Sequence, residues 1–547
     1  MLIFEIVVAM LVGGAALAAV ARRIGAPYPA LVALAGAALA LIPGVPTLVL
    51  DPELALALFV APVLVDAAFD ASPRDLRANW RTVASLALGA VALTIILVAI
   101  VARLLVPDLP WAAAIALGAI VAPPDAAAAT TVLKQLRPPH QLLVILEGES
   151  LFNDASALLV YRLAVAAMAT GFLSGWSVVP TLLFVTVGSV VLGLALARVT
   201  LWVSGRISDV ATAVVFQFGW TFGVWVLAER LHLSGIITMV VFAMTAARRA
   251  SEVIPARIRI PSWAVWEVAV FVLNVLAFIL VGFQLKSIVA RATGATGAEY
   301  AGVAAAVCLT IIVARIVWVT CATAWNRWRC RPGADGRPAR RDPIALSAKG
   351  AAVMAWCGMR GTVTLAAALA LPTGIDGGAP FPYRDLILVT AFGVVLGTLV
   401  LQGLTLRPLI LRLKLDDDDT VEREVRLARI ETLRSALAAA VKCPGAETAE
   451  LVRHRYELQL HRAEDELARR DDGRSPEPVL SPLASDYDAD AAVVRAATGA
   501  QRQRLLALRA NGTIGDAAFQ RIEEELDRAE LDWSSLLGAD PAAGTAS

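Results

Sequence analysis

The stretch Glu147-Gly148-Glu149-Ser150-Leu151-Phe152-Asn153-Asp154 places three carboxylates at the start of a segment that is otherwise apolar enough to span a membrane. From Ala155 to Gly171 this segment carries a single charge, Arg162. Ionisable groups at membrane depth are costly, and they commonly mark an ion path or a proton relay. The stretch therefore indicates a membrane protein that moves cations or protons.

The composition agrees with an integral membrane protein. Of the 547 residues, 58% are hydrophobic and 17% are charged, whereas a soluble domain carries about a quarter charged residues. The five cysteines have no paired spacing, which argues against a disulfide framework or a metal cluster. The first apolar stretch, 2–21, lacks a basic region before it and is followed by Arg22 and Arg23, so we expect a retained span and not a signal peptide.

Thirteen segments are candidates for membrane spans, because a spanning helix needs roughly 20 mostly apolar residues. We therefore predict an all-α polytopic membrane protein with about 13 transmembrane helices. Their approximate ranges are 2–21, 28–48, 52–70, 82–106, 111–133, 142–170, 177–198, 209–229, 232–247, 264–285, 299–325, 345–371 and 385–411.

The distribution of Lys and Arg predicts the orientation of these spans in the cell membrane. Alternate loops, starting with the one after the first span, carry most of the loop Lys and Arg residues. The loops between them carry only Arg230, Lys286, Arg291 and Arg384. Cytoplasmic loops are the ones enriched in basic residues. The N-terminus is therefore predicted to lie outside and the C-terminus in the cytoplasm.

The composition changes abruptly after Leu415. Residues 416–419 are all Asp, and helical patterns rich in Arg, Glu, Ala and Leu follow, interrupted by a proline-containing segment, 471–485. We predict two parts, a transmembrane domain over 1–415 and a helical cytoplasmic tail over 416–547. The tail contains no nucleotide-binding loop. It is interpreted as a helical hairpin or dimerisation element, with a regulatory role for an unidentified ligand or protein as the alternative.

The fifth predicted span is interrupted near its middle. Pro123 and Pro124 each remove a backbone donor and disrupt the preceding turn. Asp125 follows directly and can neutralise the positive N-terminal end of the second half-helix. It is nine residues from Lys134, hence about 14 Å from the inner end of the span. This depth favours a site on an ion path over a simple proline kink.

The sixth and twelfth predicted spans also carry charges at mid-depth. Ser150 and Asp154 share one helical face, and Glu149 and Asn153 share the adjacent one. In the twelfth span Arg360 lies between Gly358 and Gly361, which allow close backbone approach or a break. A buried arginine needs a partner, and Glu149 is the predicted one.

Three other intramembrane polar residues complete this picture. Arg315, in the eleventh span, also needs a partner, which the sequence does not identify. Asp66 and Asn274 are interpreted as structural and not as cation ligands.

The two interrupted spans are seven helices apart, which gives them opposite orientations in the membrane. Interrupted helices at matching positions in two halves are typical of transporters built from inverted repeats, whose site lies where the broken helices cross. We therefore expect inverted-topology repeats and two broken, crossing helices.

These residues resemble a known family. Glu149-Ser150-Leu151-Phe152-Asn153-Asp154 is similar to the E-S-L-x-N-D signature of the cation:proton antiporter-1 family, which includes bacterial sodium/proton antiporters and eukaryotic sodium/proton exchangers. Arg360-Gly361 matches that family's arginine in a Gly-x-Arg-Gly run. The thirteen-span layout matches as well, so the resemblance covers roughly residues 1–411.

The resemblance implies a core domain and a dimerisation domain, hence a homodimer, and electroneutral exchange of one cation for one proton. Asp154 would bind the alkali cation or the proton in turn, with Ser150 assisting. Asn153 stands where electrogenic relatives have a second aspartate, and Glu149 and Arg360 would form a structural ion pair. One departure concerns the family's Thr-Asp-Pro, which is here Pro124-Asp125-Ala126. The missing threonine hydroxyl leaves the preference between Na⁺ and K⁺ open.

The predicted function is secondary antiport of a monovalent cation, Na⁺ or else K⁺ or Li⁺, against H⁺, serving pH and cation homeostasis. The predicted partners are membrane lipid, these cations and protons, with no nucleic acid and no cofactor, and the protein is not expected to be an enzyme. A proton- or sodium-coupled symporter of an organic solute is the alternative. An intramembrane aspartyl protease would need an aspartate in a Gly-x-Gly-Asp setting, which neither Asp125 nor Asp154 has.

Overall fold

The structure is a computed structural model. It describes residues 2–24, 26–40, 54, 56–136, 138–170, 175–254, 256–291, 295–329, 347–372, 374, 381–415, 430, 434, 457, 460, 461 and 464. The chain divides into two units, Met1–Asp419 and Thr420–Ser547. The predicted tail helices lie outside the described residues, apart from the last six positions.

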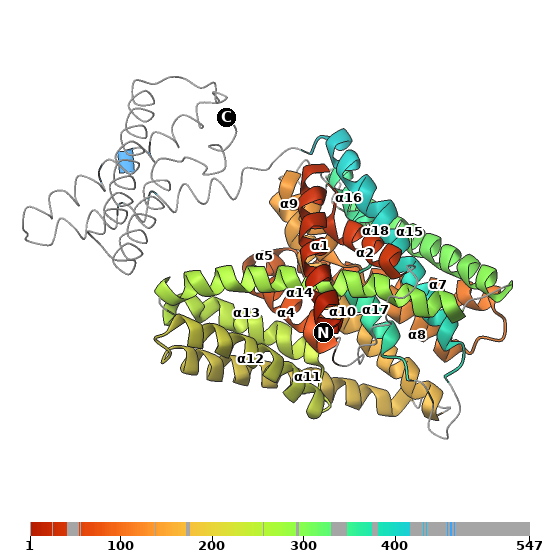
Figure 1. The fold of residues 1–547 in the computed structure, drawn as a ribbon, viewed down its shortest axis with the longest axis horizontal. Coiled ribbons are helices and arrows are strands. Elements are labelled where there is room, and N and C mark those ends of the chain that lie inside the picture. The colour runs from red at the N-terminus through yellow and green to blue at the C-terminus, as the bar shows by residue number, and fades with distance from the viewer. Residues whose placement is uncertain are drawn as a thin grey trace, which may run out of the picture. The chain divides into compact units, whose positions relative to one another are not determined.

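The described part of the first unit is almost entirely helical (Figure 1). Its elements, of which η1 and η2 are π-helical, are α1 (Leu2–Ile24), α2 (Tyr28–Ala40), η1 (Leu56–Val60), α4 (Ala61–Asp70), α5 (Pro73–Ala78), α6 (Trp80–Ala84), η2 (Ser85–Ala90), α7 (Val91–Leu105), α8 (Trp111–Val121), α9 (Ala126–Leu136), α10 (His140–Thr170), α11 (Gly175–Ser204), α12 (Val210–Arg230), α13 (Gly235–Val253), α14 (Ala256–Arg291), α15 (Ala295–Arg329), α16 (Ala348–Trp356), α17 (Thr362–Leu369) and α18 (Arg384–Leu413).

Among the described residues, eight helices are long and apolar enough to cross a membrane. Three shorter apolar helices, Tyr28–Leu39, Ala57–Phe69 and Trp111–Val121, fall within predicted spans. The prediction of an all-helical, multi-pass membrane protein is thereby confirmed, while the count of thirteen spans stays a prediction.

Side-chain caps explain where several helices begin. Ser72, Ser234 and Ser347 each accept a hydrogen bond from the backbone N–H three residues later, which satisfies a donor that has no partner within the helix. Asp209 caps α12 in the same way, with 2.8 Å between its Oδ2 and the Thr212 backbone N. The hydrogen bonds from Thr212 lower the pKa of the Asp209 carboxyl below its usual value.

Small residues let the helices approach closely, as is common inside membranes, where packing and not water exclusion drives association. Almost every residue of α8 from Ala113 to Val121 is buried, and most of these are Ala or Gly. A Cβ added to Gly118 would lie 2.7 Å from the backbone oxygen of Ile95 on α7. The close contact between α7 and α8 therefore requires glycine at this position.

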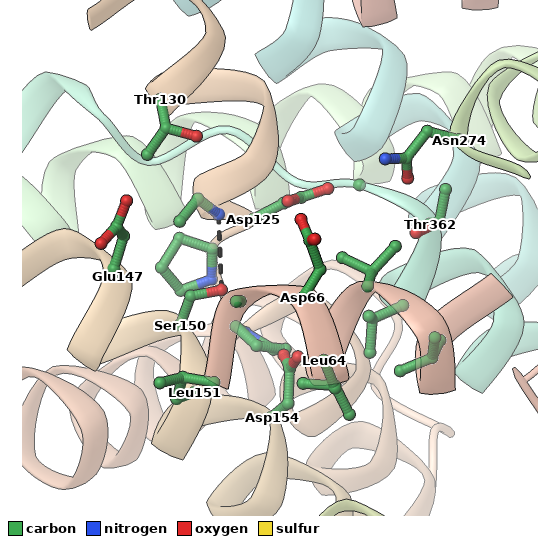
Figure 2. Close-up of a pocket in the computed structure, with 18 of the residues that line it drawn as sticks. Leu64, Asp66, Asp125, Thr130, Glu147, Ser150, Leu151, Asp154, Asn274 and Thr362 are labelled. Atoms are coloured by element: carbon green, nitrogen blue, oxygen red, sulfur yellow. Dashed lines mark hydrogen bonds between the residues drawn. The ribbon is translucent and has the colours of Figure 1, made fainter. Parts of the chain in front are cut away.

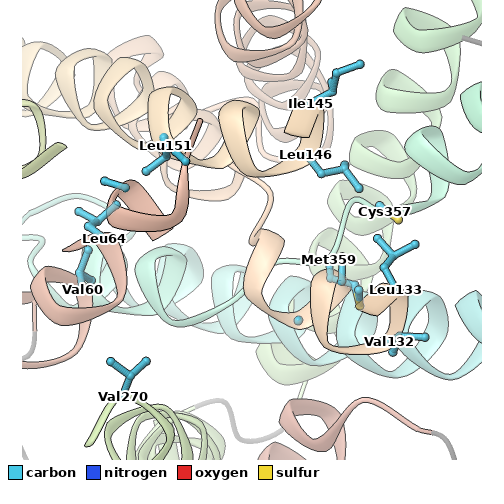
Figure 3. Close-up of a cluster of buried hydrophobic side chains, with 14 of the residues drawn as sticks. Val60, Leu64, Val132, Leu133, Ile145, Leu146, Leu151, Val270, Cys357 and Met359 are labelled. Atoms are coloured by element: carbon cyan, nitrogen blue, oxygen red, sulfur yellow. The ribbon is translucent and has the colours of Figure 1, made fainter. Parts of the chain in front are cut away.

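The helices form two groups around α10. Figure 1 shows α11, α12, α13 and α14 side by side, and α7, α8, α15 and α18 gathered elsewhere in the unit. α10 contacts members of both groups, among them α8 and α13, and it also contacts α9 and α16. Buried apolar side chains of α9, α10 and the segment after α16 pack together beside the interrupted helices, including Leu133, Ile145 and Met359 (Figure 3).

Candidate cation site

Two predicted spans are each divided into two helices, and the divided regions meet. The first leaves helical conformation between α8 and α9, around Pro123 and Pro124, and the second between α16 and α17, from Cys357 to Gly361. The backbone N–H of Asp125 donates to the carbonyl oxygen of Met359, with 2.7 Å between nitrogen and oxygen. The two broken helices are therefore joined directly through their non-helical segments.

Arg360 satisfies the carbonyl end of α8. Its Nε donates to the Val121 oxygen at 2.9 Å and its Nη2 to the Ala122 oxygen at 3.0 Å, while Nη1 donates to the carbonyl of Gly358. The carboxyl end of a helix carries partial negative charge and unpaired carbonyl groups. A buried guanidinium at this end supplies both the donors and the opposite charge.

Asp125 has the complementary place at the start of α17. Its carboxylate lies against Gly361, the residue before that helix, so closely that a Cβ on Gly361 would overlap it. The amino end of a helix favours negative charge. The sequence predicted this role for Asp125 at its own second half-helix, α9, which begins at the next residue. The structure places the carboxylate beside the start of α17 as well.

Ser150 and Asn153, on α10, form hydrogen bonds with backbone groups at the first break. The Asn153 Nδ2 donates to the Pro124 oxygen at 3.1 Å, and the backbone N–H of Ala126 lies 3.5 Å from the Ser150 Oγ (Figure 2). These bonds satisfy backbone groups that the break leaves unpaired. Asn153, predicted to bind the cation, is fully buried and does not line the cavity described next.

A cavity of about 120 Å³ lies beside the crossing (Figure 2). Four carboxylates line it, together with hydroxyl and amide groups. The carboxylates are Asp66, Asp125, Glu147 and Asp154, and the neutral polar side chains are Thr130, Ser150, Asn274, Thr362 and Thr364. Oxygen-rich sites of this composition suit hard cations.

Asp154 is the most enclosed of the predicted cation ligands that line the cavity. It is 5% exposed and lies one helical turn from Ser150 on the same face of α10. Of the other predicted site residues, Asp125, Pro123, Pro124 and Gly361 also line the cavity. Gly358 does not; it packs against the side chains of Arg315 and Arg360.

Several polar residues of the cavity were not predicted as site residues. Glu147, expected to be solvated at the end of its span, is half-buried and lines the cavity. Asp66 and Asn274, interpreted as structural, line it from α4 and α14. An isolated polar residue in an apolar segment is visible in the sequence. Which of these residues face one cavity depends on the packing of distant helices.

Glu149 pairs with Arg315 and not with the predicted Arg360. The Arg315 Nη1 and Nη2 lie 2.5 Å and 2.8 Å from the two carboxylate oxygens, and its Nε donates to the Met354 oxygen at 3.2 Å. Both side chains are almost fully buried. The predicted partner fails because the donors of Arg360 are engaged by the carbonyl groups of the broken helices. Arg315, for which no partner was predicted, thereby ties α15 to α10 and to the end of α16.

Comparison with known proteins gives the family. The model of the sodium/hydrogen exchanger transmembrane domain matches residues 6–412. The chain belongs to the sodium/hydrogen exchanger family. The predicted family and class of function, a monovalent cation/proton antiporter and not an enzyme, are thereby confirmed.

Individual relatives agree with this exchanger family. A protein of Mycobacterium tuberculosis named as an uncharacterised Na⁺/H⁺ exchanger is 29% identical over 514 residues, 93% of this chain and 92% of the relative. A Bacillus subtilis protein named sodium, potassium, lithium and rubidium/H⁺ antiporter is 31% identical over 375 residues, 65% of this chain and 54% of the relative. The solved structure of the antiporter MjNhaP1 from Methanocaldococcus jannaschii has a TM-score of 0.57 at 18% identity, covering 76% of this chain and 99% of that one, and shows the same fold.

Replacing Arg315 with Ala should strongly destabilise the exchanger, because it leaves the Glu149 carboxylate buried without its counter-charge. Breaking such a buried pair costs about 3–5 kcal/mol. Thermal unfolding of purified protein in detergent measures this. Arg162→Ala is the control, since it breaks a more exposed pair with Glu229, at 2.9 Å, for which we expect about 0–1 kcal/mol. Equal stability of the two variants would contradict the structural role of the Glu149–Arg315 pair.

Replacing Gly361 with Ala should disrupt the crossing, because the added methyl group overlaps the Asp125 carboxylate. We expect loss of exchange and a lower unfolding temperature. Gly302→Ala in α15 is the matched control, because nothing lies within 4 Å of a Cβ at that position. Wild-type exchange by the Gly361 variant would show that the contact is not required.

Proposed function

We propose that the chain exchanges a monovalent cation for a proton at Asp154, one for one. The observation that carries this proposal is the position of Asp154: a buried carboxylate that lines an oxygen-rich cavity at the crossing of two broken helices. A carboxylate in such a cavity can neutralise its charge either with a proton or with a cation. Because one group takes only one of them at a time, competition couples the two fluxes.

Asp125 and Ser150 support cation binding in this scheme. Both line the cavity with Asp154, and carbonyl groups near Pro123 and Pro124 are further oxygen donors. No nucleotide-binding loop is present in the sequence. The gradient of one ion would therefore drive the transport of the other.

The transported cation is proposed to be Na⁺, with K⁺ and Li⁺ as further substrates. The Bacillus subtilis relative is named for sodium, potassium, lithium and rubidium, which supports a broad selectivity. Pro124 contributes no side-chain oxygen, so the coordination at that position differs from a site that has threonine there.

We also propose the finer topology from the sequence: thirteen spans, inverted repeats, an external N-terminus, a cytoplasmic tail and a homodimer. The two interrupted helices meeting at one cavity support the inverted repeats. Glu147 and Thr130 also line the cavity, and each lies closer along its helix to the connection between α9 and α10 than Asp154 and Asp125 do. Lys134 and Arg137 make the sequence around this connection basic. With basic connections in the cytoplasm, this cavity would face inward.

The small volume of the cavity disfavours the alternative of an organic-solute symporter. Sites for organic ligands have volumes of about 300–1,000 Å³, whereas this cavity has about 120 Å³. Proton movement that responds to an organic solute and not to Na⁺, K⁺ or Li⁺ would reverse this preference.

Asp154→Asn should abolish cation-dependent proton movement while leaving the protein inserted, because the amide cannot exchange a proton for a cation. Everted vesicles with a pH-sensitive fluorescent dye report the exchange as dequenching on addition of Na⁺ or K⁺. Asp209→Asn is the control, since this exposed helix cap is outside the cavity and asparagine also caps helices. Wild-type dequenching by the Asp154 variant would disprove the assignment.

A further inference from the structure

We propose that Asn274, oriented by Tyr28, is a cation-specificity residue of the cavity and supplies the neutral oxygen that Pro124 lacks. This inference rests on the proposed antiport at Asp154. It assigns a coordinating role to a residue outside the broken helices and α10, on a helix that forms the opposite wall.

The cavity has two chemically different walls. The broken helices and α10 supply Asp125, Ser150 and Asp154, whereas η1, α4 and α14 supply mostly apolar side chains. Asp66 and Asn274 are the polar residues of that second wall among the lining residues that the structure describes. Figure 2 shows the Asn274 amide on the side of the cavity where Asp125 and Thr362 are drawn. An amide in an apolar wall is costly unless it has polar partners.

Tyr28 fixes the place of this amide relative to the acids. The Tyr28 side chain, on α2, hydrogen-bonds Asn274 and interacts electrostatically with Asp125. The Tyr28 side chain is therefore a polar partner of the Asn274 amide, which Figure 2 shows on the Asp125 side of the cavity. A side-chain amide has two donors and a carbonyl oxygen with two lone pairs. One bond to the tyrosine hydroxyl leaves this amide with further capacity toward the cavity.

Of the neutral polar residues Ser150 and Asn153 on α10, only Ser150 lines the cavity. The Ser150 hydroxyl accepts from Ala126 and the Asn153 amide donates to Pro124. At position 124 itself proline has no side-chain oxygen. Asn274 is the amide that lines the cavity, and carbonyl oxygens of Asn are regular ligands of hard cations. A neutral ligand of fixed position favours cations of one size without adding a charge that a proton could neutralise.

Asn274→Leu tests the proposal, because it removes the oxygen and keeps a similar volume. In everted vesicles we expect the apparent KM for Na⁺ to rise about tenfold, as for the loss of about 1.4 kcal/mol of binding, with little change in maximal rate. The relative KM values for Na⁺, K⁺ and Li⁺ should also change. Tyr28→Phe should shift the same KM values in the same direction by less, since it removes only the group that orients the amide.

Asn79→Ala is the matched control, because the buried Asn79 amide hydrogen-bonds Asp75 and Gln141 outside the cavity. The KM values of this control variant should stay those of the wild type.

If the Asn274→Leu protein is not recovered from membranes, Asn274→Gln is tested in its place, since it displaces the amide by one methylene. Wild-type KM values and ion order in the recovered Asn274 variant and in Tyr28→Phe would overturn the proposal. If Asp154→Asn still loses exchange in that case, the proposed antiport at Asp154 remains supported and only the role of Asn274 is rejected.

Discussion

The structure depends on two charged residues in the broken helices, each of which lies at a helix end of the other broken span. Arg360, in the second break, bonds the carbonyl end of α8 in the first, and Asp125, in the first break, lies at the amino end of α17 in the second. Each charged residue therefore stabilises the end of a helix that belongs to the other broken span. Unpaired backbone groups are not tolerated in hydrocarbon, so neither break is stable without the other.

This arrangement explains why the three acids of the opening stretch differ. Glu149 is neutralised by Arg315 and fastens α10 to α15. Glu147 is half-buried in the cavity wall. Asp154 lies deeper on the same helix, where the crossing leaves room for an ion. Glu149 is thus paired with Arg315 away from the cavity, whereas other carboxylates, Asp154 among them, line the cavity itself.

Local sequence patterns predict the parts of this site that local chemistry determines. Paired prolines predict the first break, and a carboxylate one turn from a serine in an apolar segment predicts Asp154 and Ser150 on one face. The pairing of Glu149 with Arg315 could not be predicted, because 166 residues separate them and Arg360 lies at similar depth. The cavity positions of Asp66 and Asn274 likewise follow from the packing of α4 and α14 beside the crossing, which no local pattern encodes.

In the proposed mechanism, proton and cation compete for Asp154. The most direct measurement is proton release by purified protein in weakly buffered solution when Na⁺ or K⁺ is added, with Asp154→Asn alongside. If they compete, the wild type releases up to one proton for each cation bound, and the variant releases none. Cation binding without proton release, or equal release by both proteins, would contradict this mechanism.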